Sequence, residues 1–338
     1  MALKLLRRGA ILFAISLLAN YAILTQPFVT ALPTPPAQVD ETMLRVHVNE
    51  LTKTFYPRSF DRRTTLQGAA AYIHTQFSLF SDSVEDQVFS VDGHEYRNII
   101  ARFGAMNGPF LVIGAHYDAY GDAVRGRNFP AGYDVTTNTP GADDNASGVA
   151  GLLELARLLA SAGPKIGVEL VAFTLEEPPN FRQDSMGSAR HARLLKVAGR
   201  KIEAMISLEM IGYFSDRPNS QTYPIPGLDF IYPNRGDFIG IVGRVQDWAV
   251  TRKVKAAMAG ASDLPVVSIN ALSLVPGLDF SDHRSYWAAG FPAVMITDTA
   301  FFRNPNYHKA SDTADTLDYT RMAKVVAGVF GVTQHYSK

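Results

Sequence analysis

The stretch "PFLVIGAHYD", Pro109 to Asp118, is an apolar run that ends in a histidine and an aspartate. Such a run is typical of a strand buried on both faces of a parallel sheet. Similar runs occur in "GVELVAFTLEE", "EAMISLEMIGY" and "FPAVMITDT", and amphipathic segments such as "SGVAGLLELARLLAS" lie between them. Strands that alternate with helices predict an α/β fold: a doubly wound, mixed and mostly parallel sheet flanked by helices.

The composition excludes several classes of site. The chain has 338 residues, of which 47% are apolar and 19% charged, as in a globular protein with a sizeable core. Basic and acidic residues number 32 each, so no basic surface for nucleic acid is indicated. The absence of cysteine excludes disulfides, thiolate ligands and cysteine nucleophiles. Any metal ion must therefore be held by imidazole and carboxylate groups.

The N-terminal segment differs from the rest of the chain. Lys4, Arg7 and Arg8 precede "GAILFAISLLANYAIL", and no further charge appears before Asp40. A basic start followed by such an apolar run is typical of a secretory signal. We therefore expect residues 1–31 to be a signal peptide, with a retained membrane anchor as the alternative, and the protein to act outside the cytoplasm. Residues 32–39 are predicted to be a Pro-rich linker, and residues 40–338 a single catalytic domain.

Acidic and histidine residues follow each predicted strand. They are His116, Asp118, Glu176, Glu177, Glu209 and, after a short loop, His308. The turn "PGADDNASG", residues 140–148, opens the next predicted helix at the same edge. In doubly wound sheets, ligands bind beyond the carboxyl ends of the strands. Each residue alone is better explained as a helix cap or a solvated rim residue. Their convergence, however, favours a divalent cation, because so many carboxylates would otherwise repel one another.

Zinc fits this set of donors. It binds His nitrogen and Asp or Glu oxygen, and two zinc ions about 4 Å apart need an oxygen ligand that bridges them. We therefore predict one or two zinc ions, with one aspartate of the turn as the bridge. The neighbouring aspartate and asparagine are expected to bind backbone groups instead.

Five motifs, taken together, identify a family. In chain order, "GAHYD", "PGADDNASG", "LEE", "SLEMIGY" and "YHKASDT" resemble the motifs of the co-catalytic zinc aminopeptidases. That superfamily also contains glutamate carboxypeptidases and glutaminyl cyclases. The resemblance runs from about Asn98 to Leu317. It implies a zinc-dependent exopeptidase with two zinc ions per chain, and among exopeptidases it favours an aminopeptidase that hydrolyses the N-terminal peptide bond with a metal-activated water. The implied substrate is a peptide or a small molecule with an N-terminal amine.

The resemblance also implies a role for each matched residue. The implied metal ligands are His116 and Glu209 for one zinc, Glu177 and His308 for the other, and Asp144 as the bridge. The implied supporting acids are Asp118, which orients His116, and Asp312, which follows His308. Glu176 is the implied general base, and Tyr307 the implied phenol that stabilises a tetrahedral intermediate. Many family members have Asp where this chain has Glu209, and the peptide bond after the bridging aspartate is often cis.

Several alternatives stay open. A glutaminyl cyclase would share the fold but would use a single zinc ion, and a binding domain would keep the fold without catalysis. Arg125 and Arg127, in the long loop between Asp118 and Asp144, could contact a substrate carboxylate or face solvent. In "SDHRSYW", Asp282 and His283 could shape the pocket or pack beneath it.

Overall fold

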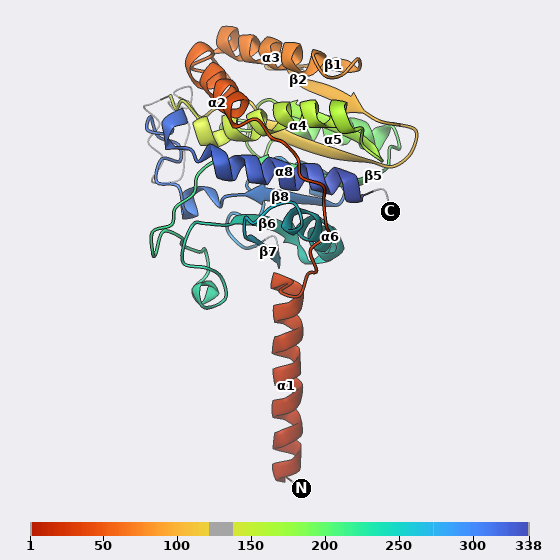
Figure 1. The fold of residues 1–338 in the computed structure, drawn as a ribbon, viewed down its shortest axis with the longest axis vertical. Helices are drawn as coiled ribbons and strands as arrows, with labels where there is room; N and C mark the ends of the chain where they lie inside the picture. The colour runs from red at the N-terminus through yellow and green to blue at the C-terminus, as the bar shows by residue number, and fades with distance from the viewer. Residues whose placement is uncertain (1, 122–137, 273, 337–338) are drawn as a thin grey trace.

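A computed structural model describes residues 2–121, 138–272 and 274–336 (Figure 1). The described residues form a mixed sheet of eight strands in the order β1-β2-β4-β3-β5-β8-β6-β7. The strands are β1 (Val84–Val91), β2 (His94–Phe103), β3 (Phe110–His116), β4 (Gly167–Phe173), β5 (Ile202–Glu209), β6 (Ile239–Arg244), β7 (Val266–Ala271) and β8 (Ala293–Thr297). The four central strands, β4, β3, β5 and β8, run parallel, so their carboxyl ends meet at one edge. The predicted fold class is confirmed.

Eight α-helices lie in the described residues, and all except α1 pack around the sheet, covering both of its faces. They are α1 (Ala2–Thr25), α2 (Glu41–Asn49), α3 (Arg63–Ser78), α4 (Gly148–Ala162), α5 (Gly187–Val197), α6 (Trp248–Ala259), α7 (His283–Ala289) and α8 (Tyr319–His335). Side chains of β3 alternate between two cores: Leu111 and Ile113 belong to the core that also contains side chains of α2, α3, α4, α6 and α8. Phe110 and Val112 pack with α5 and α7 on the opposite face. Both faces are thus buried, which explains the continuous apolar runs of the central strands.

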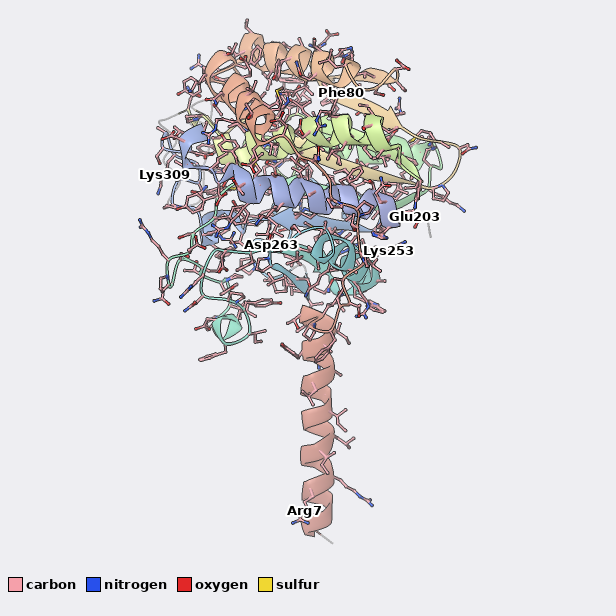
Figure 2. All side chains as sticks on the ribbon, in the orientation of Figure 1. Arg7, Phe80, Glu203, Lys253, Asp263 and Lys309 are labelled. Carbon is pink, nitrogen blue, oxygen red and sulfur yellow. The ribbon has the colours of Figure 1, made fainter. Side chains whose placement is uncertain are left out.

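The N-terminal helix α1 projects away from this body (Figure 1), and Arg7 lies near its far end (Figure 2). Its other end is held by the body, because Lys255 Nζ donates to the carbonyl oxygens of Thr25 and Gln26, each at 3.0 Å. Within the predicted linker, the Leu32 amide donates to Ala256 O at 2.9 Å. In the described part of the chain, no helix has both the length and the apolar character needed to cross a membrane.

Three elements were not predicted from the sequence. Strand β1 is half-buried and acidic, so it lacks the continuous apolar pattern of the central strands. Strand β6 contains two glycines and lies partly within a segment predicted as helix, near 243–260; that helix instead begins at Trp248. The short helix α7 starts at His283, inside the "SDHRSYW" segment.

Candidate active site

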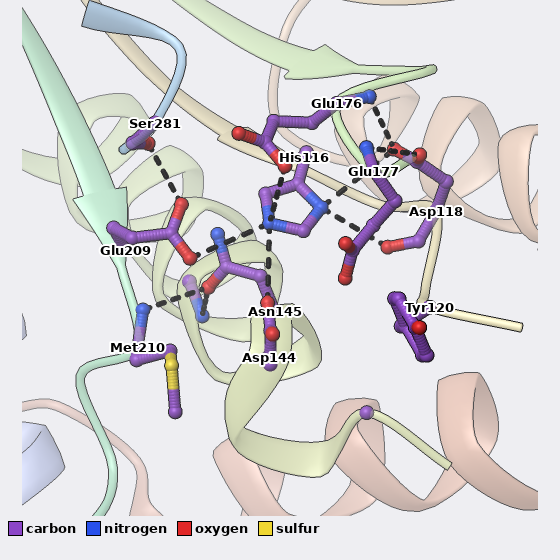
Figure 3. A network of polar contacts seen from close by, with 12 residues as sticks. His116, Asp118, Tyr120, Asp144, Asn145, Glu176, Glu177, Glu209, Met210 and Ser281 are labelled. Atoms are coloured by element: carbon purple, nitrogen blue, oxygen red, sulfur yellow. Dashed lines mark hydrogen bonds and ion pairs between the residues drawn. The ribbon is translucent and has the colours of Figure 1, made fainter. Parts of the chain in front are cut away.

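Two groups of ligand-type side chains meet at the carboxyl edge of the central strands. Figure 3 shows the four of these side chains other than His308. The first group is His116, Asp144 and Glu209; the second is Asp144, Glu177 and His308. Asp144 belongs to both: its Oδ1 lies 3.3 Å from His116 Nε2, and its Oδ2 lies 3.2 Å from His308 Nε2. Each group is completed by a glutamate, with Glu209 Oε1 at 3.5 Å from His116 Nε2 and Glu177 Oε2 at 3.4 Å from His308 Nε2. The structure therefore brings together all five predicted ligands.

These donors fit a zinc pair. His116 Nδ1 lies 3.0 Å from the Asp118 carbonyl oxygen, and a proton on Nδ1 leaves the Nε2 lone pair facing the other side chains. His116 Nε2 and Glu177 Oε1 are buried and have no hydrogen-bond partner among the described residues. Buried polar atoms rarely stay unpaired, so a missing partner is indicated at both atoms. Imidazole and carboxylate donors in groups of three suit zinc.

The turn that carries Asp144 is fixed from several sides. Gly141 has φ of +61°, and a Cβ there would lie 2.3 Å from Asp144 O, so the turn requires glycine. The Asp312 carboxylate accepts hydrogen bonds from the amides of Asp143 and Asp144, at 3.0 and 3.1 Å. Asn145 Nδ2 donates to Leu208 O at 2.8 Å, which ties the turn to β5. The Asp144–Asn145 peptide bond is cis, as the resemblance implies.

Asp143 faces away from the ligand groups. Its Oδ1 accepts from the Gly212 amide at 2.9 Å and its Oδ2 from Asn304 Nδ2 at 2.7 Å. Asp143 thus forms hydrogen bonds with neighbouring loops, and Asn145 forms one with β5, as predicted. The two adjacent aspartates therefore differ in function. Asp144 is directed at the histidines, whereas Asp143 holds the surrounding loops.

Glu176 lies beside the two groups and belongs to neither. Its Oε2 is 3.9 Å from His116 Nε2. The Asp118 carboxylate accepts from the amides of Glu176 and Glu177, at 3.1 and 3.0 Å, so it fixes the segment after β4 that carries the predicted base and a predicted ligand. Asp118 supports His116 mainly through its carbonyl oxygen, because its Oδ1 is 3.6 Å from His116 Nδ1.

His308 is held by stacking. Its ring lies between Tyr307, at 3.8 Å between centroids, and Tyr120, at 4.1 Å, both nearly parallel to it. The phenol predicted to stabilise an intermediate is thus stacked on a ligand, and its role stays a prediction. Tyr120 and Ser281 were missed by sequence reasoning. Ser281 Oγ donates to Glu209 Oε2 at 2.7 Å, and no sequence motif around Ser281 predicts that contact.

Burial and mutual repulsion set the charges of the site. Burial favours the neutral form of Asp144, but its contacts with His116 and His308 outweigh burial and hold the pKa of Asp144 well below its usual value. Burial raises the pKa of Glu177 to about 7, with the Asp144 charge adding to the effect. Burial also raises the pKa of Asp312 to about 8, next to Asp143. For Glu177, burial and the neighbouring Asp144 charge both oppose ionisation, and a cation at this position would counteract them.

The structure shows the surroundings of Asp282 and His283, whose roles the "SDHRSYW" motif left open. Burial lowers the pKa of His283 to about 4, its Nε2 lies 2.8 Å from Leu278 O, and its ring packs edge-on against Trp287. His283 is therefore a neutral packing residue. Asp282 is fully buried, and burial raises its pKa to about 7. Arg125 and Arg127 lie outside the described residues.

Residues 98–333 match the sequence model of Peptidase family M28. The chain belongs to this family. It is 50% identical over 307 residues to the "Uncharacterized protein YfbL" of Escherichia coli K12, which covers 91% of this chain and 92% of that protein. A "Probable leucine aminopeptidase" of Trichophyton verrucosum is 27% identical over 242 residues, or 69% of this chain. The chain spans only 55% of that fungal protein's length.

Solved structures show the same fold. A Zn-dependent exopeptidase of Parabacteroides distasonis superposes with a TM-score of 0.63 at 19% identity, covering 88% of this chain and 99% of that one. A glutaminyl cyclase of Bacteroides thetaiotaomicron gives a TM-score of 0.64 at 20% identity, covering 90% and 100%. The predicted resemblance to the zinc exopeptidase superfamily is confirmed.

Proposed function

We propose that this protein is a zinc-dependent aminopeptidase that removes the N-terminal residue of peptides. The observation that carries the proposal is the shared Asp144, with one carboxylate oxygen facing each histidine. Two complete groups of three donors around one bridging carboxylate fit two metal ions. A single-zinc cyclase needs only one such group, so the second group favours hydrolysis.

The residues divide the chemistry between them. His116 and Glu209 would hold one zinc ion, Glu177 and His308 the other, and Asp144 both. Bound zinc would polarise the scissile carbonyl and lower the pKa of a water molecule. Glu176 is positioned to take the proton of that water and to pass it to the leaving amine. Burial raises the pKa of Glu176 well above its usual value, which suits a group that carries a proton between two steps.

An apolar cavity next to Glu209 supports a preference for apolar N-terminal residues. Its volume is about 110 Å³, and Glu209 is its only charged residue among the described lining residues. The aromatic side chains of Phe238, Phe280, Phe301 and Phe302 contribute to its walls. A cavity of about 150 Å³ can hold benzene, so this one suits a single side chain of leucine size. We propose that it receives the side chain of the first residue.

A peptide panel tests the function. We expect purified protein with zinc to release free leucine from a Leu-Ala-Ala peptide, and to leave the N-acetylated peptide intact. Release of arginine or glutamate should be slower. A Gln-initiated peptide should yield free glutamine; conversion of that peptide to pyroglutamate without release of an amino acid would instead assign the cyclase activity.

Narrowing the cavity tests the assigned subsite. Gly240 lines it, and Gly240→Val would add a side chain into the space for substrate. We expect kcat/KM for leucyl peptides to fall about 10-fold relative to alanyl peptides, the usual effect of a few methylene groups in an apolar pocket. Alanyl turnover by the same variant is the internal control. An unchanged ratio would place the first residue elsewhere.

We also propose that the protein acts outside the cytoplasm. The support is the basic start of the chain and the charge-free apolar run that follows it. Fractionation of cells that express the full chain tests this, because a cytosolic enzyme should remain entirely in the soluble cytoplasmic fraction. N-terminal sequencing of the exported protein would distinguish cleavage after the signal from retention of residues 1–31.

A further inference from the structure

A buried arginine lies behind the ligand groups and has no part in the proposed chemistry. Arg58 is fully buried and precedes α3. Its guanidinium donates to four backbone carbonyls: Nε to Tyr117 O at 2.9 Å, Nη2 to Gly141 O at 2.5 Å, and Nη1 to Pro140 O and Leu51 O. Its own carbonyl accepts from the Ala119 amide at 3.2 Å.

These contacts join the two segments that carry the first ligand group. Tyr117 directly follows His116 at the end of β3, and Gly141 lies three residues before Asp144. A planar guanidinium with fixed donors can set the separation of two backbone segments, whereas a flexible ammonium cannot. The distance between His116 and the bridging aspartate is thus linked to a single side chain.

The charge of Arg58 is also unusual for its surroundings. No carboxylate in the described residues forms an ion pair with it, although a buried charge without a counter-charge is costly. Burial lowers the pKa of Arg58 to about 10, with Asp312, Asp144 and Asp118 acting in the opposite direction, so it is cationic at neutral pH. Burial of a neutral side chain would cost less desolvation free energy. The four carbonyl acceptors stabilise the buried guanidinium, which supplies a donor at each contact.

We propose that Arg58 is a positioning residue for zinc, which clamps the His116 and Asp144 segments at ligand separation. The proposal rests on the zinc site of the proposed function. It predicts that Arg58 controls metal affinity, while substrate turnover by the fully loaded enzyme depends on it little, since the side chain contacts neither ligand atoms nor the apolar cavity.

Zinc affinity of matched variants tests the proposal. Arg58→Lys keeps a charge without the planar fork, and Arg58→Met removes both. Arg303→Lys is the control, because Arg303 is also a buried guanidinium but donates to Gln221 Oε1 and Phe238 O, each at 2.9 Å, and not to the His116 or Asp144 segments. Affinity would be measured by competition with a chromophoric chelator, and folding by circular dichroism and thermal melting.

We expect Arg58→Lys to weaken zinc binding about 10- to 100-fold, as loss of a group that supports a metal ligand does, and Arg58→Met to weaken it further. Arg303→Lys should lower the melting temperature but keep wild-type zinc affinity. At saturating zinc, Arg58→Lys should recover most of its kcat.

The possible failures are distinguishable. Folded Arg58→Lys with wild-type affinity would overturn this inference and leave the proposed function intact. An equal loss of affinity in Arg303→Lys, or failure of both Arg58 variants to fold, would show a general folding role and also overturn it. Wild-type protein that binds no zinc would overturn the proposed function itself, and this inference with it.

Discussion

The two ligand groups share Asp144 but differ in what holds their histidine. His116 ends a central strand and its side chain is 1% exposed, and its partner Glu209 ends the neighbouring strand. His308 lies in the loop between β8 and α8, has φ of +57°, and is 11% exposed. Ligands on strands are placed more rigidly than ligands on loops. We therefore expect the His116 site to bind zinc more tightly, and the His308 site to exchange it.

Removal of the shared ligand should have the largest effect, because it affects both sites at once. Asp144→Ala takes one oxygen from each group, so we expect both zinc ions to be lost and peptide hydrolysis to fall to background. Elemental analysis of the dialysed protein measures the first effect. Asp143→Asn is the neighbouring control: it changes an acid bonded to Gly212 and Asn304 and should reduce stability while retaining zinc. Retention of two zinc ions by Asp144→Ala would contradict the bridge.

Removal of the base should separate catalysis from metal binding at both sites. Glu176→Gln keeps the shape of the side chain but cannot accept the proton of water. We expect kcat to fall about 100- to 10,000-fold while both zinc ions stay bound. Glu169→Gln, which alters another buried glutamate on β4, is the control and should keep turnover. Substantial hydrolysis by Glu176→Gln would reassign the base.

His308→Gln sharpens the comparison between the sites. It removes a ligand supplied by a loop and leaves the three side chains of the other group in place. We expect one zinc ion to remain, with an affinity within about 10-fold of the tighter site in the wild-type protein. His116→Gln should have a larger effect on total zinc affinity. If His308→Gln instead loses both ions, the two sites do not bind independently.

The smallest expected effect is the pH dependence of stability without metal. Glu177 and Asp312 have pKa values raised to about 7 and 8 in the folded, metal-free protein, chiefly by burial, above their values in the unfolded chain. The folded state then binds more protons than the unfolded state between about pH 4 and 8, so stability falls as pH rises through this window. We expect the melting temperature of the metal-free protein to be several degrees lower at pH 8 than at pH 6.

Saturating zinc should remove most of this loss, because the ions stabilise the ionised carboxylates and bind the folded state alone. Melting curves at both pH values, with and without zinc, provide the measurement. A metal-free protein that becomes more stable from pH 6 to pH 8 would contradict the assigned origin of the shifts.

Much of the site was predicted from the sequence, because ligands bind beyond the carboxyl ends of the strands in a doubly wound sheet. His116 and Glu209 end a strand and Glu176 follows one; these apolar strands are buried on both faces, and parallel strands bring their carboxyl ends to one edge. The same argument brought His308 and the turn of residues 140–148 to this edge, but the choice of Asp144 rather than Asp143 as the bridge came from the family resemblance. The roles of all these residues stay predictions until metal binding is measured.

The supporting side chains could not be predicted in this way. Arg58 and Tyr120 lie in irregular segments, and what decides their contacts is the packing of distant backbone: the Arg58 guanidinium reaches Gly141 O, 83 residues along the chain. Strand β6 was missed for a related reason. Its glycines lower the apparent strand propensity, yet it pairs with β8 and β7 and contributes Gly240 and Val242 to the apolar cavity.

The most direct test of the central claim is the zinc stoichiometry of the purified full-length wild-type chain, determined by titration of the metal-free protein. The account predicts two equivalents per chain, bound in two steps of unequal affinity, with peptide hydrolysis appearing as the second step fills. Saturation at one equivalent would contradict the bridged pair and favour a single-zinc activity.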